Sequence, residues 1–183
     1  MRLEKTDFYE WAFGNTLDNT TRAIIAEYLV HRAVGGVDRH RLNWNAFDIE
    51  TPEGFTIEVK AAGLIQSWAT EKQCVPEFDI SIKNKLWLAR ENRYIPMTTR
   101  YSDIWVFAFH EETDRNLAEP LDTSQWRFLV TTSKWLEQNF GDQNKVRLSV
   151  LIKHGLTTVP YDRLRMNLLD KAKTISKSVI PVG

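Results

Sequence analysis

The stretch that decides the fold runs over residues 42–62 and reads LNWNAFDIETPEGFTIEVKAA. Its two halves alternate apolar and polar residues, which is the pattern of half-buried β-strands. Between them, Pro52-Glu53-Gly54 is typical of a turn. The pattern therefore predicts an antiparallel hairpin with strands Leu42–Thr51 and Phe55–Ala62.

The alignment of this hairpin brings two carboxylates together. With a three-residue loop, Thr51 pairs with Phe55, so Asp48 lies opposite Glu58, with Cβ atoms about 4.5–5.5 Å apart. Lys60 shares the face of Glu58, because residues two apart on a strand project to the same side. Two negative charges at such a distance repel, and a divalent cation such as Mg²⁺ or Mn²⁺ offsets the repulsion better than a lysine does. A surface hairpin with incidental cross-strand charges fits the same spacing.

A helix precedes the hairpin. Its body reads TRAIIAEYLVHRAV, with Thr20 or Thr21 as the cap and Gly35-Gly36 as the end. Glu27 lies in a row of apolar residues, where a carboxylate is costly without a partner. That partner is either a metal site or, at the rim of the helix, the neighbouring His31 or Arg32.

Strands and helices follow the hairpin. The predicted strands are 103–110, which is apolar throughout as expected of burial on both faces, 125–131 and 146–153. The predicted helices are 133–140, capped by Ser133, and 159–173, capped by Asp162. We expect residues 1–183 to form one α/β domain with a mixed sheet flanked by helices. Residues 1–19 would be an arm or short helix, and 174–183 a fraying tail.

The composition excludes several classes of protein. Of 183 residues, 43% are hydrophobic and 26% charged, which argues against disordered, collagen-like and coiled-coil chains. Basic and acidic residues balance at 24 each, so no net charge points to a partner. Cys74 is the single cysteine, and no signal-peptide pattern opens the sequence, so we expect a reducing, cytoplasmic setting without a membrane partner.

The segment 83–100, KNKLWLARENRYIPMTTR, concentrates positive charge and interleaves aromatic residues. Basic side chains contact phosphates, and aromatic rings stack on unpaired bases. The candidate nucleic-acid-binding residues are Lys83, Lys85, Trp87, Arg90, Arg93 and Arg100. A solvated face would account for the same run of charge. Among the seven tryptophans, Trp68 and Trp87 are the better candidates for exposed roles, and most of the others lie in predicted strands or helices, where they are expected to pack in the core.

Together these features resemble the PD-(D/E)xK superfamily, the restriction-endonuclease-like nucleases. The resemblance rests on Glu27 in TRAIIAEYLV, Asp48 in NAFDIE and Glu58-Val59-Lys60 in FTIEVKAAG, followed by the apolar strand IWVFAF. It covers roughly residues 20–160 and is specific over residues 22–67. Phe47 stands where the family pattern has proline, at a position that varies within the superfamily. The resemblance implies a mixed sheet core between helices.

The resemblance also implies an activity, the metal-dependent hydrolysis of phosphodiester bonds in DNA by an endonuclease. Asp48, Glu58 and the backbone carbonyl of Val59 would ligate Mg²⁺, for which Mn²⁺ would substitute, and Glu27 would complete the metal shell. Lys60 would orient the attacking water and stabilise charge in the transition state. Gln66 matches an auxiliary glutamine of some related nucleases, or it is an ordinary polar residue at a strand end. The products would carry 5′-phosphate and 3′-hydroxyl groups.

Two alternatives belong to other classes of function. One is a non-catalytic nucleic-acid-binding or assembly module on the same fold, although a binding role does not require all four polar site residues. The other is an interaction protein whose charged hairpin is incidental. A homodimer would fit the nuclease interpretation, because cutting both strands of a duplex usually needs two active sites.

Overall fold

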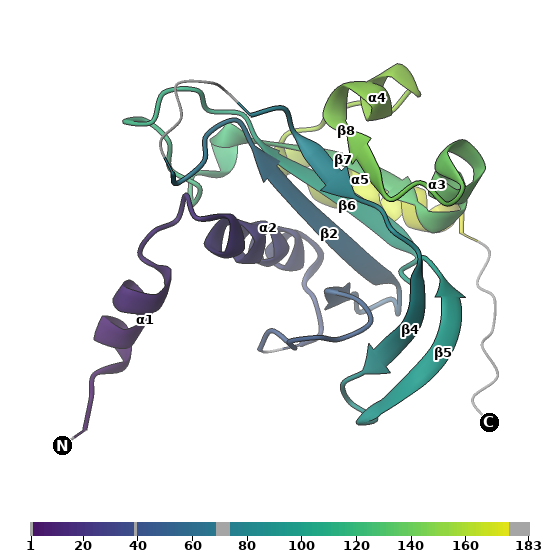
Figure 1. Cartoon of the computed structure of the whole chain (residues 1–183), viewed down its shortest axis with the longest axis horizontal. Coiled ribbons are helices and arrows are strands. Elements are labelled where there is room, and N and C mark those ends of the chain that lie inside the picture. Colours follow the sequence, from purple (N-terminus) through teal and green to yellow (C-terminus); the bar gives the residue numbers. More distant parts are fainter. Residues whose placement is uncertain (1, 39, 69–73, 176–183) are drawn as a thin grey trace.

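A mixed four-stranded sheet forms the centre of the fold in the computed structural model, which describes residues 2–38, 40–68 and 74–175 (Figure 1). Its strands stand in the order β1 (Ile49–Glu50), β2 (Thr56–Gly63), β6 (Ile104–His110) and β7 (Trp126–Thr132). β2 runs parallel to β6, and the other two pairs are antiparallel. The predicted α/β class with a mixed sheet and flanking helices is therefore confirmed.

Each face of the sheet packs against its own hydrophobic cluster. Helices α2 (Asn19–Val34) and α5 (Tyr161–Lys173) cover one face. Helices α3 (Ser133–Phe140) and α4 (Leu148–Lys153), with the small sheet of β3 (Glu77–Asp79) and β8 (Lys145–Arg147), cover the other. Alternate residues of β6 enter the two clusters, so the prediction that this strand is buried on both faces is confirmed.

The hairpin that carries the acids has the predicted alignment but a much shorter first strand. Ile49 lies opposite Ile57, and the Thr51 N–H donates to the Phe55 carbonyl at 2.9 Å. The predicted strand over residues 42–51 is wrong, because only β1 is extended. Trp44 adopts a φ of 64°, which is incompatible with a strand and turns the preceding chain into a loop.

Several helix caps and one strand end also differ from those predicted from the sequence. Asp18, not Thr20 or Thr21, caps α2, since its carboxylate accepts the Thr20 N–H at 2.9 Å. Thr132 replaces Ser133 as the cap of α3. Pro160, not Asp162, is the N-cap residue of α5. The predicted strand over residues 146–153 is confirmed only at its first two residues, which belong to β8, and is wrong beyond Arg147, where α4 follows with Leu151 buried under the sheet.

Three further elements lie at the periphery. Helix α1 (Lys5–Phe13) projects from the body with none of its residues buried, so the segment 1–19 contains the short helix that the sequence left open (Figure 1). The hairpin of β4 (Lys83–Leu88) and β5 (Arg93–Thr99) extends beyond the end of the central sheet. A 3₁₀ turn, η1 (Thr123–Gln125), precedes β7. The predicted tail lies outside the described residues from position 176 onward.

Candidate functional site

Asp48, Glu58 and Lys60 meet at the edge of the central sheet, beside the middle of β2 and just before β1 begins. Asp48 is the residue before β1, and its Oδ2 accepts the Val59 N–H at 2.7 Å. Glu58 and Lys60 project from the same face of β2 and form an ion pair of 2.6 Å between Oε1 and Nζ. Ile57 and Val59 point to the opposite face and are buried under α2. The alternation predicted for this strand is thus confirmed.

Lys60 remains protonated at neutral pH. Burial lowers the pKa of its ammonium group, while the charge and hydrogen bond of Glu58 raise it, and the net pKa lies above its ordinary value. The ammonium also lies 5.6 Å from the centre of the Trp105 ring. Held by a carboxylate and an aromatic face, this cation has a fixed position beside the two acids.

The carboxyl of Asp48 is strongly perturbed. Burial raises its pKa first, and the negative charges of Glu58 and Glu27 add to the effect, against the opposing hydrogen bond from Val59 and the charge of Lys60. The resulting pKa is about 8. Without a further cation, Asp48 therefore holds a proton at neutral pH.

The backbone of β2 supplies a further oxygen at the same edge. A residue in a strand turns its N–H and its carbonyl to the same side of the strand. Because the Val59 N–H reaches Asp48, the Val59 carbonyl faces the edge on which Asp48 lies. The carboxylates of Asp48 and Glu58 and the carbonyl of Val59 thus lie around one point at the sheet edge.

This donor set fits a magnesium ion. Mg²⁺ takes hard oxygen ligands, keeps several waters and is commonly held by only one or two carboxylates. The described residues contain no group of three His, Cys, Asp or Glu side chains arranged to hold a metal ion. A two-carboxylate site with a backbone carbonyl does not require such a group. The pKa of Asp48 is raised first by burial and then by the charges of Glu58 and Glu27, and a dication bound there would favour the ionised carboxylate against both effects.

Glu27 has a different partner from those that the sequence suggested. Arg41 forms a bidentate ion pair with it, through Nε at 2.5 Å and Nη2 at 2.8 Å. Glu27 lines a cavity of about 170 Å³ on the α2 side, and Asp48 borders this cavity too. The ion pair satisfies the carboxylate in the apolar row, and the role of Glu27 as a metal ligand stays a prediction.

Gln66 does not lie near Asp48 and Glu58. It lies beyond the other end of β2, where its Oε1 accepts a hydrogen bond from Arg22 Nη2 at 3.1 Å. It lines a separate cavity with Cys74 and Arg22. Its side chain supports the buried Arg22, which also donates to the Ile65 carbonyl at 2.6 Å.

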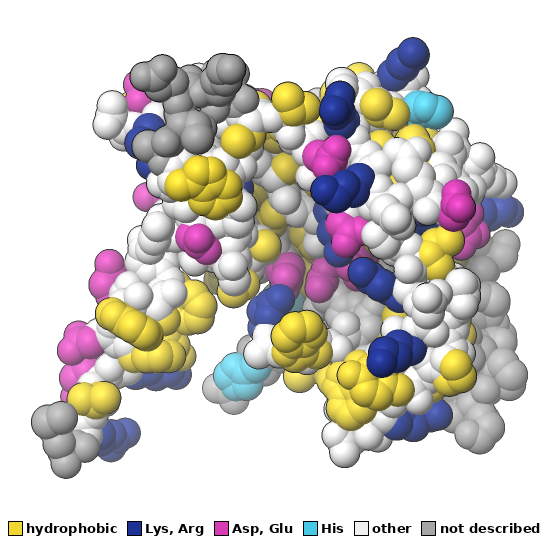
Figure 2. Space-filling model, in the orientation of Figure 1, with side chains coloured by type: hydrophobic (Ala, Val, Ile, Leu, Met, Phe, Trp, Pro, Cys, Tyr) yellow, Lys and Arg dark blue, Asp and Glu magenta, His cyan; other side chains and the backbone are white. Residues whose placement is uncertain are grey.

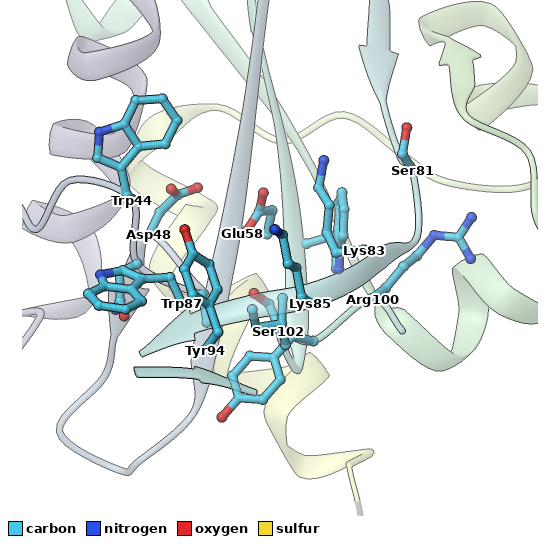
Figure 3. Close-up of a pocket in the computed structure, with 15 residues that line it drawn as sticks. Trp44, Asp48, Glu58, Ser81, Lys83, Lys85, Trp87, Tyr94, Arg100 and Ser102 are labelled. Atoms are coloured by element: carbon cyan, nitrogen blue, oxygen red, sulfur yellow. The ribbon is translucent and has the colours of Figure 1, made fainter. Parts of the chain in front are cut away.

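The candidate nucleic-acid-binding residues divide into two groups. Lys83, Lys85 and Trp87 line a cavity of about 520 Å³, whose wall also contains Asp48 and Glu58 (Figure 3). Figure 2 shows acidic side chains in the hollow at the centre of this face, with Lys and Arg side chains gathered over the β4–β5 hairpin beside it.

The arginines of this set make structural contacts. Arg90 bridges Asp38 and Glu50 at 2.8 and 2.5 Å, and Arg93 pairs with Glu91 at 2.7 Å. Arg100 is buried at one end of the large cavity and donates to the Ile80 and Gln143 carbonyls. Arg90 and Arg93 remain half exposed or more.

Sequence reasoning missed Trp44. It was expected in a strand and in the core, yet it is 89% exposed and lines the large cavity. The asparagines on both sides of it are turn formers and carried the available signal. Trp68 is exposed as expected.

Comparison of the sequence with protein-family models gave no match, and comparison with curated proteins gave none either. Within the described part of the chain, no helix has the length and apolar character needed to cross a membrane.

Proposed function

We propose that this protein is a metal-dependent endodeoxyribonuclease with a restriction-endonuclease-like fold. One observation carries the proposal. Asp48, Glu58 and Lys60 meet at one sheet edge, where the pKa of Asp48 is raised to about 8 by burial and by neighbouring carboxylates. Groups perturbed in this way inside a cleft are typical of functional sites.

The residues that would hold Mg²⁺ are Asp48, Glu58 and the Val59 carbonyl. When bound, such an ion polarises a phosphate oxygen and lowers the pKa of water. Asp48 and Glu58 contribute the charge that binds it, and the Val59 N–H keeps the Asp48 carboxylate oriented toward the sheet edge. Glu27 would contribute to the field around Asp48 from the other side, since its charge already raises the pKa of that residue.

Lys60 supplies a positive charge that stabilises the transition state. Its ammonium is protonated and held at 2.6 Å from Glu58, so it can donate a hydrogen bond to a phosphate oxygen that gains charge in the transition state. Hydrolysis adds the hydroxyl of water to phosphorus and breaks the bond to the 3′ oxygen, which receives the proton. The products are then a 5′-phosphate and a 3′-hydroxyl.

Cleavage of DNA in the presence and absence of metal tests this function. We expect the protein to cut DNA in Mg²⁺ or Mn²⁺, to lose all cutting in EDTA, and to lose it in Asp48→Ala and Glu58→Ala with Mn²⁺ present. The measurement is gel analysis of end-labelled linear, nicked, branched and single-stranded substrates. Asp7→Asn, on the exposed helix α1, is a matched control for removal of an acid.

Two outcomes would contradict the proposal. Full cleavage by Asp48→Ala or Glu58→Ala would refute the site. Binding of DNA in EDTA without cleavage of any DNA form in Mn²⁺ would favour the non-catalytic nucleic-acid-binding module instead.

A further inference from the structure

The large cavity beside Asp48 and Glu58 has an aromatic wall. Trp87 and Tyr94 lie opposite each other in the β4–β5 hairpin, with ring centres 4.8 Å apart. The ammonium of Lys85 lies 5.1 Å from the centre of the Tyr94 ring. Trp44 lines the same cavity from the loop that precedes β1 (Figure 3).

Packing in the core does not explain why a tryptophan stands at position 44. Its side chain is 89% exposed, so it buries little apolar surface. Its backbone is in the left-handed region, with φ at 64°, where glycine or asparagine would be less strained. A large aromatic side chain held in water at such a position is more typical of a binding surface than of a core.

Positive charge accompanies the aromatic rings. Lys83, Lys85 and Trp87 are spaced two residues apart on β4, and all three line the cavity. The cavity volume of about 520 Å³ falls within the roughly 300–1,000 Å³ of typical ligand pockets. Aromatic faces, ammonium groups and the two acids therefore share one recess of the size of an ordinary ligand pocket.

We propose that this recess binds an unpaired nucleotide, so that the preferred substrate is single-stranded DNA or DNA with a single-stranded flap. This inference rests on the nuclease function proposed above. Bases inside a duplex are stacked on their neighbours, whereas an unpaired base offers its face to an aromatic side chain. With a base on Trp44 or Trp87 and its phosphates near Lys83 and Lys85, the adjoining phosphodiester reaches Asp48 and Glu58.

Binding and cleavage of matched DNA forms test this inference. One labelled oligonucleotide is used as a single strand, as a blunt duplex and as a flap on a duplex, all at one ionic strength because phosphate contacts depend on salt. Dissociation constants come from fluorescence anisotropy in EDTA, and cleavage rates from Mn²⁺ reactions. We expect the single strand and the flap to bind and to be cut at least about tenfold better than the duplex.

The tryptophans provide matched variants. Trp44→Ala should weaken binding of the single strand by about 5- to 150-fold, and Trp44→Phe should restore most of it, because stacking requires an aromatic face. Trp11→Ala removes a comparably exposed tryptophan, 85% exposed on α1, and should leave the dissociation constant for the single strand unchanged.

Failure of this inference is distinguishable from failure of the nuclease proposal. Equal binding and cleavage of all three DNA forms, or a Trp44→Ala variant that matches Trp11→Ala, overturns the unpaired-nucleotide site. Cleavage that still depends on Asp48 and Glu58 would then leave the nuclease proposal standing. Absence of both binding and cleavage on every DNA form overturns both.

Discussion

Lys60→Met is expected to lower the rate of DNA hydrolysis by about 100- to 1,000-fold, the usual effect of removing one positioned donor from a transition state. Methionine keeps much of the volume of the lysine stem but carries no charge. The two acids remain, so the affinity for Mn²⁺ should not fall. Single-turnover cleavage at saturating Mn²⁺ measures the rate, and calorimetry measures metal binding.

Lys134→Met is a suitable control for this prediction, because Lys134 is exposed on α3, outside the lining of the large cavity. It should cleave like the wild type. A Lys60→Met variant with the wild-type rate would show that this ammonium has no part in the reaction. Loss of Mn²⁺ binding in the same variant would instead show that Lys60 holds the acids in place.

Without metal, Asp48→Asn is expected to be more stable than the wild type above about pH 4, by a margin that grows as the pH rises because the wild type loses stability. The Asp48 carboxyl has a folded-state pKa of about 8, above its ordinary value of 3.8, so the folded protein holds a proton that the unfolded chain has released. Wild-type stability relative to the variant is therefore greatest below about pH 4 and is lost as the pH rises to about 8. Between these two pH values, the difference in the free energy of unfolding between the two proteins changes by about 1.4 kcal/mol per pH unit.

Urea unfolding of both proteins in EDTA between pH 4 and pH 9 measures this difference. Asparagine keeps an oxygen to accept the Val59 N–H, so the pair differs mainly in charge. We expect nearly equal stability at pH 4 and an advantage of a few kcal/mol for Asp48→Asn at pH 8. A difference in unfolding free energy that did not change with pH would contradict a raised pKa of the Asp48 carboxyl.

Metal should offset part of the advantage that Asp48→Asn has over the wild type at pH 8. At 100 times its dissociation constant, Mn²⁺ would add about 2.7 kcal/mol to the wild type, because it binds the folded state alone. Asp48→Asn lacks one charged ligand and should gain much less. Exposed Asp7→Asn should follow the wild type in every condition.

Local sequence was sufficient to predict the acidic hairpin. Alternation fixed which side chains of β2 face the core, and Pro52-Glu53-Gly54 fixed the length of the loop. Position 48 therefore had to stand opposite position 58, as the pairing of Ile49 with Ile57 shows. These features depend on neighbours a few residues apart, so no knowledge of tertiary packing was needed.

Features that depend on tertiary packing could not be predicted. The residues before β1 alternate much as a strand does, yet the φ of Trp44 makes them a loop. That loop brings Arg41 to Glu27, fourteen residues away, and satisfies a charge for which the sequence offered only a metal or an adjacent helix residue. Residues 66–100 are mixed in pattern and predict no definite strand or helix, and only the folded position of the β4–β5 hairpin places Lys83 and Lys85 in one cavity with the acids.

The central claim is that Asp48, Glu58 and the Val59 carbonyl form one site for a hard dication, and anomalous diffraction from crystals soaked in Mn²⁺ tests it most directly. The claim predicts a single strong peak at the sheet edge within coordination distance of both carboxylates and the Val59 carbonyl. A peak elsewhere, or density at that edge explained by water alone at saturating Mn²⁺, would contradict it.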